Sequence, residues 1–376
     1  MALPTTIKAH SPSPAGIDFR SDTFTSPCEA MFAAMLEASL GDSVYNEDES
    51  TNQLQNMLAE WCGQEAGLFC VTGTLSNQIA IRTHLHQPPH SVLCDYRSHI
   101  YAHEAGGLAT LSQAMVIPVR PANKVYMTLD DVKENIIPYS GDIHEAPTRV
   151  ISLENTLDGA LMPIKSIHEI SEFAHANGYL VHLDGARLWE ASAATGITLK
   201  EYGRFFDSMS LCLSKGLGAP IGTILVGSAE FIRKANWFKK QNGGGIRQSG
   251  PLAAAATVAI MQNWPKLKAV HAKTKDLAQY CVSLGYKLTM PADTNMIWLD
   301  LKGAGITNED LIDECIKNSI KSFGYRIVLH HQTTDYAIDM MKLSLKNVMD
   351  RAIAEGRGAI ETKEKSSYYN TSKDTK

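Results

Sequence analysis

The sequence of 376 residues lacks the features that mark several classes of protein. No window approaches 18 consecutive apolar residues, and the opening stretch MALPTTIKAHSPSPAG has no apolar core of signal-peptide length. Positive charge is not in excess, since 35 Lys and Arg stand against 40 Asp and Glu, a net charge of −5. These absences favour neither nucleic acid nor a membrane as a partner. We therefore expect a cytoplasmic protein.

The cysteines show no spacing that marks a disulfide-rich or metal-binding protein. Seven cysteines are present, an odd number, and none forms a CxxC pair; they stand at 28, 62, 70, 94, 212, 281 and 315. The pattern predicts free thiols in a reducing compartment and gives no support to a disulfide framework. Because no ligand cluster with metal spacing is visible either, we predict no metal site.

A dinucleotide-binding fingerprint is the next feature that is missing. The stretch GLGAPIG (216–222) resembles one, but its last glycine comes one position late. The β-rich run TILVG follows it, whereas the fingerprint needs a helix N-terminus beneath the pyrophosphate. This excludes a nicotinamide-dependent dehydrogenase.

The composition that is present describes an ordinary globular protein. Hydrophobic residues make up 44% of the chain and charged residues 20%. At about 150 residues per domain, the length predicts two domains. We expect a flexible N-terminus at 1–16, a large domain at 17–264, a small C-terminal domain at 265–360 and a disordered tail at 361–376.

The large domain alternates short apolar runs with helical stretches. A representative helix candidate at 163–178 has an apolar face and a terminal glycine, and another lies at 76–86. Strands that alternate with helices of this length predict an α/β fold with a mostly parallel sheet covered by helices. The expected strands are 66–71, 91–94, 114–119, 149–154, 179–183, 208–214 and 223–227.

The pattern changes after about residue 265, where a smaller α+β domain is expected. Residues 26–40 form a separate amphipathic helix that we expect to pack on the small domain or on a partner chain. The small domain itself would contain a long helix at 265–285, strands at 295–301, 326–331 and 340–345, and helices at 308–319 and 347–360.

Three places where a strand opens into a turn could carry chemistry. Gly73-Thr74 begins a helix, which makes an anion site or an ordinary N-cap. Asp184 follows an apolar strand, where it could meet a cationic ring nitrogen, cap the next helix or pair with Arg187. Lys215 comes 31 residues later, so that both groups can lie on neighbouring strand ends. A lysine beside a carboxylate and an anion site suits a Schiff base to a phosphorylated aldehyde cofactor, although a strand-end lysine reaching for water is the alternative.

A glycine-rich stretch, KKQNGGGIRQSG (239–250), offers a close-approaching backbone. Lys240 and Arg247 could reach a phosphate from it, or it could be a flexible surface turn. Taken together, the motifs resemble the low-specificity L-threonine aldolases, in particular the fungal ones, over roughly residues 17 to 350. The resemblance rests on DFRSDTFTSP (18–27), GDSVYNEDEST (41–51), VTGTLSNQIAI (71–81), HEAGG (103–107), GDIHEAPTR (141–149), SLENTLDG (152–159), HLDGARLW (182–189), CLSKGLGAPIG (212–222) and GGGIRQSG (243–250).

The resemblance implies pyridoxal 5'-phosphate as cofactor and the aspartate-aminotransferase-like fold type I. By position, Lys215 would bind the cofactor covalently and Asp184 would pair with its pyridine nitrogen. His99 would stack on the ring, and Gly73 and Thr74 would hold the phosphate.

The same resemblance implies a homo-oligomer, a dimer or a tetramer with shared active sites. Lys240 and Arg247 would contact the phosphate from a neighbouring chain. His144 would contact the β-hydroxyl of the substrate, and either His99 or His144 would act as the base.

The implied substrate is a small β-hydroxy amino acid such as L-threonine or L-allo-threonine, cleaved to glycine and acetaldehyde. Ser21, Arg187 and Arg326 would bind its carboxylate, and Arg187 would also lie beside the cofactor. Tyr45 and Glu104 would complete the wall of the pocket. Other histidines are expected at surface or helix positions without a chemical role; they are 84, 86, 90, 168, 175 and 271.

Three positions depart from the family pattern. Asn46 and Tyr325 stand where glycine is usual, and His331 stands where tyrosine is usual. Drift at the rim of the pocket would explain them. The alternative is an altered reaction, because some fungal relatives are alanine racemases that serve cyclic-peptide synthesis.

Overall fold

A computed structural model describes residues 13–86 and 89–357, so that the expectations for 1–12 and 361–376 fall outside the described residues. A seven-stranded sheet has the order β1-β7-β6-β5-β4-β2-β3. Within the described chain only β7 runs against the others, which confirms the mostly parallel α/β sheet. The strands are β1 Ala66–Cys70, β2 Ser91–Asp95, β3 Met115–Val119, β4 Thr148–Glu154, β5 Leu180–Gly185, β6 Ser208–Cys212 and β7 Thr223–Gly227.

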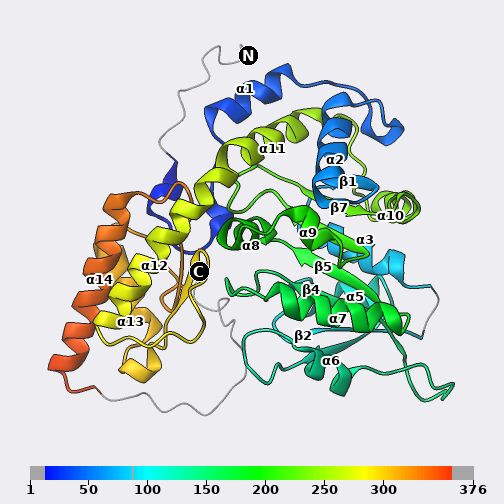
Figure 1. Cartoon of the computed structure of the whole chain (residues 1–376). Helices are drawn as coiled ribbons and strands as arrows, with labels where there is room; N and C mark the ends of the chain where they lie inside the picture. The colour runs from blue at the N-terminus through cyan, green and yellow to red at the C-terminus, as the bar shows by residue number, and fades with distance from the viewer. Residues whose placement is uncertain (1–12, 87–88, 358–376) are drawn as a thin grey trace.

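Helices cover both faces of this sheet (Figure 1). None of the described helices has the length and apolar character needed to cross a bilayer. The α-helices are α1 Glu29–Glu37, α2 Glu49–Cys62, α3 Gly73–His84, α4 His99–Ala102, α5 Gly107–Thr110, α6 Leu129–Asn135, α7 Ile164–Ala176, α8 Leu188–Thr195, α9 Leu199–Gly203, α10 Ala229–Gln241, α11 Gly250–Asn263, α12 Leu267–Ser283, α13 Asn308–Lys317 and α14 Asp335–Ala354. Short 3-10 helices lie at Pro14–Ile17, Asp22–Phe24, Ser43–Tyr45, Trp264–Lys266 and Lys302–Ala304.

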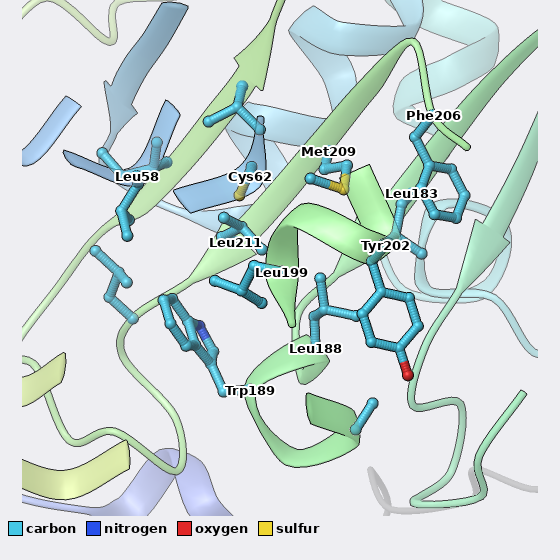
Figure 2. Packing of buried hydrophobic residues seen from close by; sticks show 14 of the residues in the cluster. Leu58, Cys62, Leu183, Leu188, Trp189, Leu199, Tyr202, Phe206, Met209 and Leu211 are labelled. Atoms are coloured by element: carbon cyan, nitrogen blue, oxygen red, sulfur yellow. The ribbon is translucent and has the colours of Figure 1, made fainter. Parts of the chain in front are cut away.

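The two faces of the central strands differ in polarity, because successive side chains in a strand point to opposite sides. On one face Leu183, Met209 and Leu211 pack in an apolar core with residues of α2, α8 and α9 (Figure 2). On the other face His182 of β5 and Ser208 of β6 are fully buried against α3. A helix therefore covers a polar strip of the sheet, and this strip leads to the site.

A second apolar core lies among α12, α13 and α14 and a two-stranded antiparallel sheet of β8 Met296–Trp298 and β9 Arg326–Val328. Phe19, from the start of the chain, is buried in this core, and its N–H donates to the Lys321 carbonyl at 2.8 Å. The N-terminal segment thus packs on the smaller, C-terminal part. The expected domain limits stay predictions.

Two expectations for this part of the chain are wrong. Residues 340–345 form no strand, and no new helix begins at 347, because α14 runs without a break from Asp335 to Ala354. Thr334 caps it, and Met341 and Leu345 point into the core at helical spacing. The helix α1 packs along α11 within this chain, so that the small-domain alternative is not supported and the partner-chain alternative stays a prediction (Figure 1).

Candidate functional site

The carboxyl ends of three neighbouring strands bring the central groups together. Glu154 ends β4 and lies opposite Asp184 of β5 in the strand register. Lys215 follows β6, which pairs with β5. This is the edge at which open α/β sheets bind ligands. The prediction that Asp184 and Lys215 lie on neighbouring strand ends is therefore met in the geometry.

The Asp184 carboxylate is buried and fixed on both oxygens. Its Oδ2 accepts a hydrogen bond from Asn77 Nδ2 at 2.7 Å, and its Oδ1 accepts from the Ala186 N–H at 3.0 Å. The Arg187 guanidinium donates to a different carboxylate, that of Asp22, at 2.8 and 2.7 Å. The Ala186 contact shows a local turn, but α8 begins only at Leu188.

A second buried carboxylate, Glu104, orients His99. Its Oε1 accepts from Asn77 Nδ2 at 3.0 Å and from His99 Nδ1 at 2.8 Å, and its Oε2 accepts from Gln78 Nε2 at 2.6 Å. Since Nδ1 of His99 donates, Nε2 is left as the basic nitrogen. The His99 side chain is 37% exposed, so that one face of the ring is open to a ligand.

His99, Glu104 and Asp184 also stand close enough to share a cation, with ligand atoms within 4.8 Å of one another. No sequence spacing revealed this cluster, because the three residues come from different elements. In the structure the Asn77 amide lies between the two carboxylates and donates to both. The cluster is thus held together by an internal hydrogen-bond donor.

Glu154 adds a buried acid beside this cluster. Burial, together with the nearby Asp184 carboxylate, holds the pKa of Glu154 well above its ordinary value. Its Oε2 accepts the backbone N–H of His99 at 3.0 Å, which positions the start of α4. The nearby Lys215 ammonium acts in the opposite direction on the same carboxyl group.

The predicted carboxylate-binding residue Arg187 is held by an aspartate that sequence reasoning did not single out. Its Nε and Nη2 donate to the two oxygens of Asp22 at 2.8 and 2.7 Å. Asn295 Nδ2 donates to the same carboxylate at 3.2 Å. Burial alone would raise the pKa of Asp22, but the guanidinium outweighs it and the pKa lies below the ordinary range.

Ser21 and Arg326 are the other two predicted carboxylate-binding residues. Ser21 is buried beside Asp22, and its Oγ accepts the Thr23 N–H at 3.3 Å. Arg326 donates from Nη2 to the Arg20 carbonyl at 2.7 Å, while its buried Nε has no hydrogen-bond partner among the described residues. An unpaired guanidinium N–H of this kind is suited to a carboxylate ligand.

Lys215 is fixed through its backbone. Its carbonyl accepts from Thr25 Oγ1 at 2.8 Å and from the Gly218 N–H at 2.9 Å. The side chain lines a small cavity that Arg187, Glu190 and Cys212 also line. The positive charge of Lys215 acts to lower the pKa of both Asp22 and Glu154. The lysine therefore stands among the site residues and does not reach away into solvent.

The start of α3 fits the phosphate of pyridoxal phosphate. Thr72 Oγ1 caps the helix by accepting the Leu75 N–H at 3.0 Å, so that the first turn presents free N–H groups at Gly73 and Thr74. A side chain at Gly73 would meet only Thr223 Oγ1, at 3.7 Å. That hydroxyl is buried and has no partner among the described residues. An unused hydroxyl donor thus lies beside the helix N-terminus.

Four of the predicted site residues lie on the surface of this chain. Arg247 pairs with Asp42 at 2.9 Å and lies over the ring of Tyr45, which is 69% exposed. Lys240 is exposed beside Gly245. The sequence placed Lys240 and Arg247 in a neighbouring chain's site, which stays a prediction.

His144 also lies on the surface. Its side chain is 85% exposed, and its Nδ1 is 2.7 Å from Asp142 Oδ1. Within the described chain no hydrogen bond or ion pair joins it to Asp184, His99 or Lys215. Its role in catalysis stays a prediction that needs movement of its loop or a second chain.

Sequence reasoning missed the residues that support the site. They are Asp22, Asn77, Gln78, Glu154, Thr223 and Asn295. One signal was available, because Ser76, Asn77 and Gln78 form a polar run in a helix that had to pack on the sheet, and all three are buried. Such residues need internal partners, since unpaired polar groups are costly to bury.

The three departures from the family pattern have local explanations. Asn46 is exposed and has a φ of 60°, a left-handed conformation that asparagine tolerates where glycine is usual. His331 Nδ1 lies 2.9 Å from the Gly216 carbonyl, so that this side chain contacts the loop of Lys215. The ring of Tyr325 packs on Trp298 at a centroid distance of 5.7 Å.

Comparisons with known proteins agree with this geometry. Residues 18–304 match the family model of the beta-eliminating lyases. The chain is 51% identical to a low specificity L-threonine aldolase of Saccharomyces cerevisiae, over 90% of this chain and 88% of the relative, and 38% identical to the alanine racemase TOXG of Cochliobolus carbonum, over 88% and 87%. A threonine aldolase structure of Leishmania major matches 88% of this chain and 99% of its own, with a TM-score of 0.77 at 18% identity. The chain therefore belongs to the beta-eliminating lyase family and, within it, to the low-specificity L-threonine aldolases.

Proposed function

We propose that this protein is an aldolase that cleaves L-threonine and L-allo-threonine to glycine and acetaldehyde. The observation that carries the proposal is the grouping of Lys215, Asp184 and His99 at one edge of the sheet, beside Arg187. A covalent anchor, a carboxylate for a ring nitrogen, a stacking imidazole and a carboxylate-binding guanidinium are the parts that this reaction needs.

Pyridoxal phosphate is the cofactor of this family, and when bound it withdraws electrons from the Cα of an attached amino acid. The residues present fit it. Lys215 would hold its aldehyde carbon, Asp184 its ring nitrogen, and Gly73, Thr74 and Thr223 its phosphate. The exposed face of His99 would lie on the ring.

Arg187 gives the site its selectivity for an amino acid carboxylate. Asp22 holds two of its nitrogens, so that the planar group keeps one orientation. Ser21, next to Asp22 in the chain, and Arg326, which donates to the Arg20 carbonyl and has an unpaired Nε, are the other groups that could bind the carboxylate.

We propose His99 as the base that removes the β-hydroxyl proton. Its Nδ1 proton is held by Glu104, and Nε2 is the atom available to accept a proton from the substrate. Loss of that proton lets the hydroxyl oxygen become a carbonyl while the Cα–Cβ bond breaks, and acetaldehyde leaves. His144 is the second candidate, provided that its loop reaches the site.

The test is acetaldehyde release from L-allo-threonine and from L-threonine by the purified protein with pyridoxal phosphate. A Lys215→Ala variant is the control. Aldehyde at the level of that control would contradict the proposal. Exchange of the α-proton of L-alanine for deuterium, without any aldehyde from threonine, would instead support the racemase.

We also infer that the chain assembles into a dimer or tetramer that shares its active sites, in the cytoplasm. Exposed Lys240, Arg247, Tyr45 and His144 support a partner surface, and all seven cysteines are free, as in reducing compartments. Light scattering coupled to gel filtration would give the mass. A monomer of 41.1 kDa with full activity would contradict the inference.

A further inference from the structure

A line of buried polar side chains runs away from the site between α3 and the sheet. It begins at Asp184, whose Oδ2 accepts from Asn77 Nδ2 at 2.7 Å. Asn77 Oδ1 lies 3.3 Å from His182 Nε2, and His182 Nδ1 lies 2.8 Å from Ser208 Oγ. The same hydroxyl lies 2.7 Å from His84 Nε2. All five residues are at most 6% exposed.

Both histidines in this line are neutral. Burial lowers the pKa of His182 to about 4, and it lowers the pKa of His84 well below the ordinary value. A neutral imidazole has one donor and one acceptor nitrogen. The direction of each hydrogen bond can therefore be worked out in order, starting from the end of the line at Asp184.

That end is the pair of carboxylates. Asn77 Nδ2 gives its two protons to Asp184 and Glu104, so its Oδ1 can only accept. The proton in the next bond must therefore lie on His182 Nε2.

The same reasoning extends to the far end of the line. His182 Nδ1 is left as an acceptor, and the Ser208 hydroxyl donates a hydrogen bond to it. The Ser208 oxygen then accepts from His84 Nε2. Every donor in the line consequently points toward Asp184.

We propose that His84, Ser208 and His182 are positioning residues, which act through Asn77 to hold the Asp184 carboxylate in place for the ring nitrogen of the cofactor. Aligned hydrogen bonds polarise one another, and they stabilise a negative charge at the end that receives the protons. The proposal rests on the binding of pyridoxal phosphate at Asp184. It gives a role to His84, which the sequence placed in a helix without chemistry.

The structure offers a matched control two residues along the same strand. Ser210 Oγ also faces α3, where it lies 2.7 Å from Ser76 Oγ, and both residues are buried. No hydrogen bond found among the described residues links this pair to Asp184. Ser210 lies opposite Asp184 in the strand register, and Ser210→Ala therefore removes a buried hydroxyl from the same interface without removing a hydrogen bond of the line.

The experiment compares two ligands, because only one of them can respond to Asp184. Cofactor-free protein is titrated with pyridoxal phosphate and with an analogue in which a C–H group replaces the ring nitrogen. We expect Ser208→Ala to raise the Kd of pyridoxal phosphate about threefold to tenfold and to leave the Kd of the analogue unchanged. Ser208→Thr, which keeps the hydroxyl, should bind both ligands as the wild type does, and so should Ser210→Ala.

The outcomes separate the hypotheses. Equal weakening of both ligands in Ser208→Ala would show a structural role only, and wild-type affinity for both would show that the line does not reach the ring; either result overturns the proposal. Should Ser208→Ala melt before the titration temperature, the pair His84→Gln, which keeps a donor, and His84→Leu carries the same comparison. Wild-type protein that binds pyridoxal phosphate without releasing acetaldehyde would refute the aldolase proposal and leave this one standing.

Discussion

Replacing Asp22 by asparagine tests how the site holds Arg187. The Asp22 side chain is fully buried and accepts four hydrogen bonds, two of them from the Arg187 guanidinium, whose side chain is 14% exposed. Breaking a buried ion pair costs about 3–5 kcal/mol. Because Arg187 keeps some contact with water, we expect the lower end, about 3 kcal/mol. At about 2–4 °C per kcal/mol, Asp22→Asn should melt about 6–12 °C below the wild type at pH 7.

The pH dependence follows from the direction of the pKa shift. The folded-state pKa of Asp22 lies below that of an unfolded aspartate, which is about 3.9. The stabilisation by the ionised carboxylate is therefore complete above that value and is lost as the pH falls toward the folded-state pKa. We expect a constant difference in melting temperature between wild type and Asp22→Asn from pH 8 to about pH 5, which narrows in stronger acid.

The assay is a thermal melt at each pH, with Asp276→Asn as the control. Asp276 also pairs with a cation, Lys342 at 2.7 Å, but its side chain is 66% exposed, and exposed pairs contribute little. Asp22→Asn should also raise the KM for threonine more than it lowers kcat, since Arg187 loses its fixed orientation. Equal melting temperatures for Asp22→Asn and wild type, or a difference that stays unchanged in acid, would refute the reasoning.

The remaining predictions concern catalysis and packing. His99→Phe should keep pyridoxal phosphate but lose about 10²–10⁴ in kcat, and an unchanged rate of acetaldehyde release would move the base to His144. Lys215→Ala should retain no cofactor after borohydride treatment, as intact mass will show; a retained adduct would place the covalent anchor elsewhere. Leu58→Ala should lower the free energy of unfolding by about 2–5 kcal/mol, because Leu58 is fully buried in the large core; denaturant titration checks this. Gly218→Ala should also destabilise, since its φ is +78° and a Cβ would approach His331 Cε1 to 3.0 Å; a melting temperature equal to that of wild type would contradict this.

The local pattern of apolar residues was sufficient to predict the strands of the large domain. Each of its seven strands lies within two residues of the expected limits, because each is a short apolar run bounded by a turn. The pattern failed at 340–345, where MMKLSL fits a buried strand as well as one face of a helix. The deciding contacts are with the other helices of the small core, which lie far away in sequence.

The site residues also fall into two groups, those that local sequence predicts and those that only the fold brings to the site. Lys215 and Asp184 could be predicted, because a strand end fixes where each side chain lies, and the family resemblance supplied the roles of His99 and Arg187. The partner of Arg187 could not be predicted, since Asp22 is 165 residues away and reaches the site only through the fold of the N-terminal segment. His271 shows the same limit: its ring is 2.6 Å from the buried carboxylate of Glu190, a contact that helix periodicity alone cannot indicate.

The reversed strand β7 has a consequence for motion in the site. Because β7 runs antiparallel to β6, the chain between them returns directly to the edge it left, and the ladder continues from Cys212 opposite Thr223 to the Leu213 N–H on the Gly222 carbonyl at 2.9 Å. Lys215 thus sits in a closed hairpin with the Ala219 N–H bonded back to the Leu213 carbonyl at 3.0 Å. Amide hydrogens at Leu213 and Ala219 should exchange with solvent as slowly as those of the sheet itself. We therefore expect the backbone around Lys215 to keep its place when substrate enters and leaves the site.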